Sequence, residues 1–105
     1  MPNSSTILER ILAELPIDYV GLWWIPKHLR EDLGIHDPEE LRSQSLALVT
    51  ALLAQHKVVF GHFVGGRFRS WNEAGASAVA RIDREWRNLG HEPSIGDIGW
   101  FDLQK

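Results

Sequence analysis

Apolar residues recur at helical spacing in the first third of the chain. Thr6 and Glu9 match a capping box, so a helix is predicted to begin at Thr6 and to end before Pro16. A second, short helix is predicted to begin at Pro26 and to close at Gly34, because proline suits the first helical position and glycine the residue after the last. The two apolar stripes are Ile7, Leu8, Ile11, Leu12 and Leu15 in the first helix, and Leu29 and Leu33 in the second.

The clearest helix start in the sequence is at Asp37. Aspartate as the cap and Pro38 in the first position satisfy or remove free backbone amides, and Glu39 and Glu40 favour the positive end of the helix dipole. This third helix is predicted to continue to about Gln55. Its buried stripe is Leu41, Ser45, Leu48, Val49 and Leu52, widened by Leu46 and Leu53.

A β-hairpin and a fourth helix follow. The runs "KVVFGHF" and "RFRSW" are rich in aromatic and β-branched residues and flank the glycine turn "VGG", which predicts the hairpin. The fourth helix is predicted to follow Asn72 as its cap and to end at Gly90, and a short strand is expected from Ile98 to Leu103. The stripe of that helix is Ala78, Val79, Ile82, Trp86 and Leu89.

The order of these elements predicts an α+β fold of winged-helix-like form. Three helices are followed by a hairpin as the wing, and a C-terminal helix and a short terminal strand are added. A chain of 105 residues is long enough for one apolar core and too short for two, so residues 1–105 are predicted to form a single domain.

Composition limits the cellular setting and the chemistry. The chain has no cysteine, which removes disulfides and thiolate metal sites and suits a reducing compartment. No apolar run approaches the ~18 residues of a membrane span, and the start "MPNSSTILER" lacks the pattern of a secretory signal. We therefore expect a soluble, cytoplasmic protein that does not contact a membrane.

The net charge of −3 is unevenly distributed. Residues 1–40 carry eight acidic and three basic side chains, whereas residues 41–105 carry six acidic and eight basic ones. The acidic density is highest at Glu31, Asp32, Asp37, Glu39 and Glu40. Such a cluster repels phosphate and attracts a basic partner, although ordinary helix starts and solvated helix faces also produce clusters of this kind.

The charges on the third helix argue against duplex DNA as the partner. A winged helix usually places this helix in the major groove, where it needs basic or amide side chains, and here its start is acidic. Arg67 and Arg69 on the wing, with Lys57 at its base, are still able to contact a phosphate backbone. A winged-helix DNA-binding transcriptional regulator therefore remains the alternative, and nucleic-acid binding is not the expectation.

None of the five histidines stands in a spacing typical of metal ligands. His56 and His62 are expected to lie about 20 Å apart along an extended segment, too far to share a metal ion. His36 beside Asp37 has the form of a general base with an orienting carboxylate, but Asp37 is already explained as a helix cap. We expect no catalytic residues, no cofactor and no metal site.

The stretch "YVGLWW" places two tryptophans side by side. Residues 18–24 connect the first two helices, and the pattern leaves open whether they form a strand or a helical turn. Trp23 and Trp24 point in directions about 100° apart in a helix and to opposite faces in a strand. One of them is expected to pack inward and the other to stay partly exposed beside Glu31 and Asp32, as an apolar anchor with an acidic rim.

Three stretches carry a family resemblance. They are "DYVGLWWIPKHLREDLGI", "DPEELR" followed by "LALVTALL", and "ARIDREWRNLGHEPSIGDIGWF", and the likeness covers roughly residues 17–102. The last stretch is the most specific. Together they resemble a family of small bacterial proteins that look like immunity proteins, which are partners of the toxins used in competition between bacteria. The resemblance implies a protein that binds and neutralises a cognate toxin in the producing cell.

The resemblance and the charge pattern predict the same kind of protein. An immunity protein works by occlusion and often meets a basic toxin with an acidic surface, because complementary potentials speed encounter. The expected function is that of a binding protein without catalytic activity. Its predicted partner-binding residues are Trp23, Trp24, Glu31, Asp32, His36, Asp37, Glu39 and Glu40.

Overall fold

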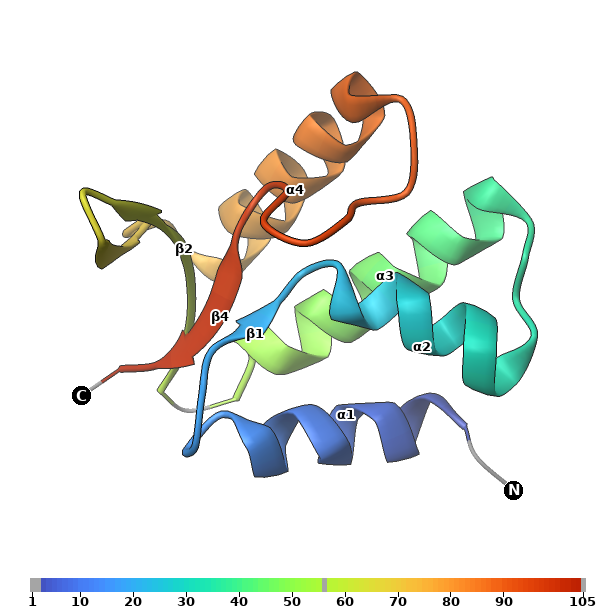
Figure 1. The fold of residues 1–105 in the computed structure, drawn as a ribbon, viewed down its shortest axis with the longest axis horizontal. Helices are drawn as coiled ribbons and strands as arrows, with labels where there is room; N and C mark the ends of the chain where they lie inside the picture. Colours follow the sequence, from blue (N-terminus) through green and yellow to red (C-terminus); the bar gives the residue numbers. More distant parts are fainter. Residues whose placement is uncertain (1–2, 56, 105) are drawn as a thin grey trace.

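A computed structural model describes residues 3–55 and 57–104 (Figure 1). Within these residues the chain forms four helices and one antiparallel four-stranded sheet, so the predicted α+β class is confirmed. The elements are α1 (Ser4–Glu14), β1 (Val20–Gly21), α2 (Trp24–Leu33), α3 (Pro38–Leu53), β2 (Val58–Val64), β3 (Arg67–Ser70), α4 (Gly75–Leu89) and β4 (Trp100–Leu103).

The first two helices begin earlier than their sequence signals predicted. The prediction of Thr6 as the cap of α1 is wrong, because Asn3 is the cap and its side chain accepts a hydrogen bond from Thr6 N at 3.1 Å. An asparagine is as good a cap as a threonine and here adds three residues, nearly one turn, to the helix. Helix α2 starts at Trp24 and not at Pro26, and it closes at Gly34 as predicted, in the left-handed conformation (φ 69°).

Helix α3 follows its sequence signals closely. Asp37 accepts a hydrogen bond from Glu40 N at 3.0 Å and Pro38 is the first helical residue, as predicted. The helix ends at Leu53, two residues before the expected end at Gln55. Its buried residues are the predicted ones, Leu41, Ser45, Leu48, Val49 and Leu52.

Helix α4 keeps its predicted stripe but not its predicted cap. Asn72 does not cap it, because Asn72 adopts a left-handed conformation (φ 58°) in the turn between β3 and α4. Asparagine tolerates this conformation better than most residues. The helix begins at Gly75 after Ala74, which makes no side-chain cap, and Gly90 closes it as predicted. Ala78, Ile82 and Trp86 are its buried residues.

The sheet joins strands that are far apart in the sequence. Its order is β1-β4-β2-β3, so β4 lies between the short strand β1 and the hairpin of β2 and β3. The predicted hairpin is confirmed, with Gly65 and Gly66 both at positive φ in its turn. Strand β4 begins at Trp100 and not at Ile98, because Ile98 has a φ of 68° and cannot lie in an extended strand.

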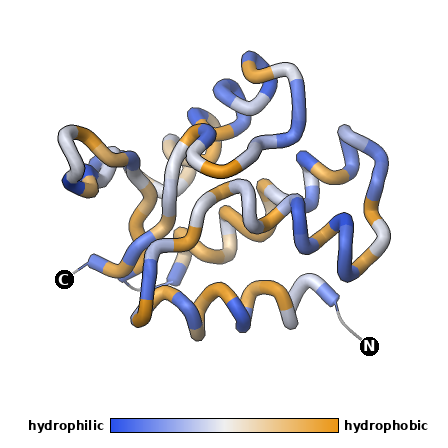
Figure 2. Tube along the Cα trace, viewed as in Figure 1, coloured by the Kyte–Doolittle hydropathy of each residue, from blue (hydrophilic) through white to orange (hydrophobic). Residues whose placement is uncertain are grey.

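The core is formed by one face of the sheet and the apolar stripes of the helices. Phe101 is fully buried at the centre of the sheet and meets Phe60 edge to face, with ring centroids 4.8 Å apart. Among the most buried helix residues are Ile7, Ile11, Ile25, Leu29, Val49, Leu52 and Ile82. Hydrophilic positions gather around the connection between α2 and α3 (Figure 2). No helix among the described residues has both the length and the apolar character that crossing a membrane requires.

Candidate functional site

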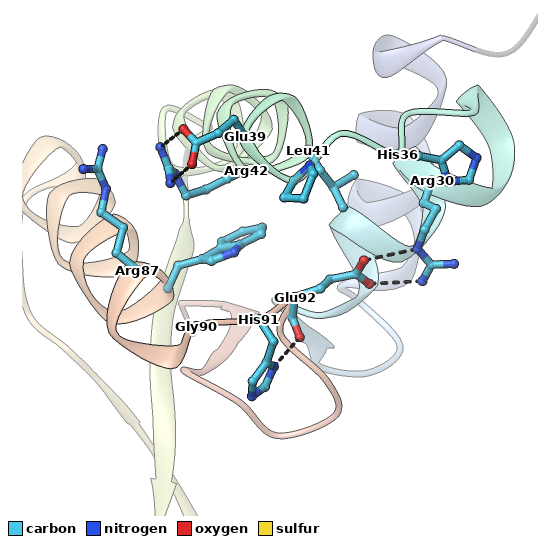
Figure 3. A pocket seen from close by; sticks show the side chains of 11 residues that line it. Arg30, His36, Glu39, Leu41, Arg42, Arg87, Gly90, His91 and Glu92 are labelled. Carbon is cyan, nitrogen blue, oxygen red and sulfur yellow. Dashed lines mark hydrogen bonds and ion pairs between the residues drawn. The ribbon is translucent and has the colours of Figure 1, made fainter.

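A pocket of about 580 Å³ opens where the C-terminal ends of α2 and α4 meet the N-terminal end of α3 (Figure 3). Its volume is within the range of small-ligand and side-chain pockets in proteins. The lining residues are Arg30, His36, Pro38, Glu39, Leu41, Arg42, Trp86, Arg87, Gly90, His91 and Glu92.

The apolar part of the pocket comes from residues that also belong to the core. Trp86 is 6% exposed and lies on the buried stripe of α4, one turn after Ile82. Leu41 is 4% exposed and is the first buried residue of α3. An indole and an isobutyl group at the base of a pocket favour the side chain of an apolar residue.

Two ion pairs form opposite sides of the pocket (Figure 3). Arg42 donates from Nη1 and Nη2 to the two carboxylate oxygens of Glu39, each at 2.9 Å. Arg30 donates from Nε and Nη2 to the two carboxylate oxygens of Glu92, each at 3.1 Å. The hydrogen bond and charge of Glu92 raise the pKa of Arg30 above its ordinary value. Both pairs are bidentate, which fixes the orientation of the guanidinium planes.

Asp83 of α4 contacts two arginines that line the pocket. Arg42 Nε lies 3.2 Å from Asp83 Oδ1, as a charge contact without an aligned hydrogen bond. The same oxygen accepts a hydrogen bond from Arg87 Nε at 3.1 Å. The side chain of Arg42 is therefore held between carboxylates from α3 and α4.

Two histidines complete the polar rim. His36 is exposed just before α3. The Nδ1 atom of His91 lies 2.9 Å from the backbone oxygen of Glu92, within hydrogen-bond distance. No group of three or more histidine or carboxylate side chains suited to a metal ion occurs among the described residues.

The rest of the acidic segment is largely compensated within the chain. Asp32 forms an ion pair with Arg10 of α1 at 2.9 Å, and Glu31 lies 3.8 Å from Arg30. Asp37 is the cap of α3, and Glu40 accepts a hydrogen bond from Gln44. Glu39 is 77% exposed despite its pair, and Glu40 is exposed as well.

The adjacent tryptophans contact different residues, and the expected position of one of them beside Glu31 and Asp32 stays a prediction. The ring of Trp24 is stacked on His28 with ring centroids 3.6 Å apart, and it packs against the core. Trp23 covers Gly21, where an added Cβ would meet the indole, and Lys27 Nζ lies 5.5 Å from its ring centroid. Both indoles are half-buried. Neither of them lines the pocket.

Only some of the predicted partner-binding residues line the pocket. His36 and Glu39 line the pocket, and Asp37 and Glu40 adjoin them in sequence. The remaining four do not line it; these are Trp23, Trp24, Glu31 and Asp32. His56 lies outside the described residues, so its expected separation from His62 is untested.

Sequence reasoning missed most of the residues that form the pocket. Arg30 and Glu92 are 62 positions apart, and no local pattern connects them. Five lining residues fall within a stretch of seven positions, namely Trp86, Arg87, Gly90, His91 and Glu92, but no motif among them indicates a site.

No protein-family model, curated protein or solved structure matches this chain.

Proposed function

We propose that this protein is a binding protein without catalytic activity, an immunity protein that neutralises a cognate bacterial toxin by occluding it. The observation that carries the proposal is the pocket, which combines an apolar base with two oriented ion pairs. A loop of a toxin inserts an apolar side chain against Trp86 and Leu41. Its backbone and polar groups then meet the donors and acceptors of the two pairs.

The negative charge at the start of α3 supports a basic partner. Glu39 and Glu40 present exposed carboxylates at the start of α3, and Asp37 adds a third beside them. Complementary potentials accelerate encounter and disfavour partners of the same sign. The expected setting is the cytoplasm of the cell that produces the toxin.

The proposal includes a winged-helix-like relationship for the fold. The order of α1, β1, α2, α3 and the β2–β3 hairpin supports it. Helix α4 and strand β4 are additions to that plan, and β4 separates β1 from the hairpin.

The test begins with co-purification of the tagged protein from its native strain and identification of the bound protein. Affinity for that partner is then measured for Glu39→Gln, Glu40→Lys and the two changes together. We expect the double change to weaken binding about tenfold or more, equivalent to about 1.4 kcal/mol. The matched control for Glu40→Lys is Glu14→Lys, which makes the same charge change on the exposed side of α1.

Affinity that is the same for the double variant and the wild type removes this surface from the proposal. Recovery of a protein that is not a toxin removes the immunity role. The second candidate, a DNA-binding regulator, is favoured by one observation, the exposed side chains of Arg67 and Arg69 on the hairpin. A sequence-selective mobility shift of duplex DNA that persists at moderate salt supports that candidate.

A further inference from the structure

The outer edge of β3 is open to an additional strand. In the sheet order β1-β4-β2-β3, β3 is the last strand, and among the described residues only β2 pairs with it. Figure 1 shows the hairpin at the border of the molecule, on the side away from α2. An edge strand presents backbone N–H and C=O groups that are able to pair with a strand of another chain.

Hydrogen bonding within the hairpin determines which backbone groups point outward. Trp71 N donates to Phe60 O at 3.0 Å, so these two residues form a hydrogen-bonded pair. Such pairs alternate with non-hydrogen-bonded pairs along an antiparallel ladder. The N–H and C=O groups of Phe68 and Ser70 therefore point to the open edge.

The side chains along this edge divide by face. Arg67 and Arg69 share one face of β3, and Phe68 is on the other. Both arginines are exposed, and neither forms an ion pair with a described carboxylate. This distinguishes them from the arginines that do form such pairs, which are Arg10, Arg30, Arg42, Arg81 and Arg87. The charge of the edge is therefore available to a partner.

An aromatic cluster lies on the opposite face of the hairpin. The ring of Phe68 is 5.8 Å from Phe63 and 5.4 Å from Tyr19, measured between centroids. Phe63 also meets Trp100 edge to face at 5.9 Å, and it remains 41% exposed. Exposed aromatic rings next to a free edge give an apolar contact for one side of an added strand.

We propose that an extended, acidic segment of a partner protein binds the edge of β3 as a fifth strand. Its backbone pairs with Phe68 and Ser70, and its acidic side chains at alternate positions face Arg67 and Arg69. An apolar side chain on its other face extends the aromatic cluster beside Phe68. Main-chain hydrogen bonds supply affinity in this binding mode, and the alternating side chains supply specificity.

A second copy of the chain fits this edge poorly. In a symmetric antiparallel pair, opposite residues lie on the same face of the sheet. The register with Phe68 opposite itself places Arg67 opposite Arg69 twice, and the next register places Arg69 opposite itself. Side chains in such positions are about 4.5–5.5 Å apart at Cβ, where like charges destabilise the pair. A carboxylate at the same position is attracted instead.

The edge is also separate from the pocket, because no residue of β3 lines the pocket. Binding at β3 therefore does not depend on the proposed immunity function. Backbone donors and acceptors in equal number suit a polypeptide strand better than a phosphate chain, which offers acceptors only.

The test uses labelled peptides and the whole protein. One peptide alternates glutamate and valine over about eight residues, the length of an ordinary strand. The control peptide has the same length and alternates lysine and valine. We expect saturable binding of the glutamate peptide, weaker binding at high salt, and slower hydrogen exchange at the amides of Phe68 and Ser70. The lysine peptide is expected not to bind.

Three variants separate charge from backbone pairing. Arg67→Glu combined with Arg69→Glu is expected to reverse the preference, so that the lysine peptide binds and the glutamate peptide does not. Ser70→Pro removes an outward N–H that β2 does not use, and a loss of about tenfold or more in affinity is expected. Arg84→Glu, which makes half of that charge change at an exposed position of α4, is the control and is expected to leave binding unchanged. Circular dichroism verifies that each variant is folded.

Several results overturn the proposal. The first is equal binding of both peptides, and the second is binding that Ser70→Pro leaves unchanged. The third is the absence of saturable binding of the glutamate peptide up to about 5 mM, a concentration that corresponds to a binding free energy of about 3 kcal/mol. Binding of an oligothymidine in place of the peptide assigns the edge to nucleic acid. Dimerisation of the wild type through β3 assigns it to a second copy.

Discussion

The glycines at positions 34 and 75 differ in backbone conformation, because only Gly34 has a positive φ. Gly34 closes α2 at a φ of 69°, in the region that side chains with a Cβ avoid. Gly75 is the first residue of α4 and has no positive φ. Space is not the difference, because a Cβ at Gly34 would meet nothing within 4 Å and one at Gly75 would meet only Leu53 Cβ at 3.8 Å. Backbone conformation alone separates the two sites.

Alanine at these two positions is therefore predicted to have opposite effects on stability. Gly34→Ala should lower the free energy of unfolding by about 1–2 kcal/mol, because it forces a Cβ into the left-handed region. Gly75→Ala should leave it unchanged or raise it by about 0.4–1 kcal/mol, because the unfolded chain loses freedom. Urea denaturation of both variants measures the difference, and equal effects would contradict the account.

At the scale of the elements, the start of α3 serves stability and surface charge together. Asp37 is exposed, yet its carboxylate accepts the hydrogen bond from Glu40 N that caps the helix. Glu39 and Glu40 lie in the first turn, where negative charge interacts favourably with the helix dipole. The charge that made this segment a candidate for binding is thus partly explained by the helix itself.

Loss of the cap should destabilise the protein measurably. Asp37→Ala is predicted to lower the free energy of unfolding by about 1 kcal/mol, within the usual range of about 0.5–2 kcal/mol for helix caps. Ser43→Ala, an exposed change in the same helix, serves as the control and should have little effect or stabilise slightly. Chemical denaturation compares the two, and an unchanged midpoint for Asp37→Ala would show that the cap contributes nothing.

At the scale of the molecule, the loop between α4 and β4 connects the C-terminal part of the chain to helix α2. It leaves the end of α4 and returns beside α2 to enter the sheet (Figure 1). Glu92 ties it to Arg30, and Asp97 holds its turn by accepting hydrogen bonds from Ser94 N and Ser94 Oγ, each at 2.9 Å. The bonds from the backbone and side chain of Ser94 lower the pKa of Asp97.

This lowered pKa predicts a pH dependence of stability. Because the folded-state pKa of Asp97 is below the unfolded one, its contribution is complete above the ordinary aspartate range and is lost as the pH falls through the lowered value. Asp97→Asn should be less stable than the wild type near neutral pH, and the difference should shrink toward about pH 3. Denaturation midpoints of both proteins over this range measure it. A difference that stays constant with pH would contradict the role of Asp97.

Sequence signals predicted the helix ends and the turn correctly where these depend on contacts between neighbouring residues. Asp37 and Pro38 begin α3, Gly34 and Gly90 close α2 and α4, and the glycine turn forms the hairpin, because each depends on neighbours within a few residues. The buried stripe of α3 was also determined by its periodicity. The cap at Asn72 failed because Asn72 has a φ of 58° in the connection from β3, and the helix begins only at Gly75.

The helices, the hairpin and the α+β class were thus predictable from the order of the residues, since all of these follow from short-range sterics and spacing. Folding was needed to reveal the pairing of β1 with β4, the meeting of Arg30 with Glu92 and the pairing of Asp32 with Arg10. These contacts join residues far apart in the chain. Nothing in the spacing of either partner encodes the other, because packing of the core sets their distance.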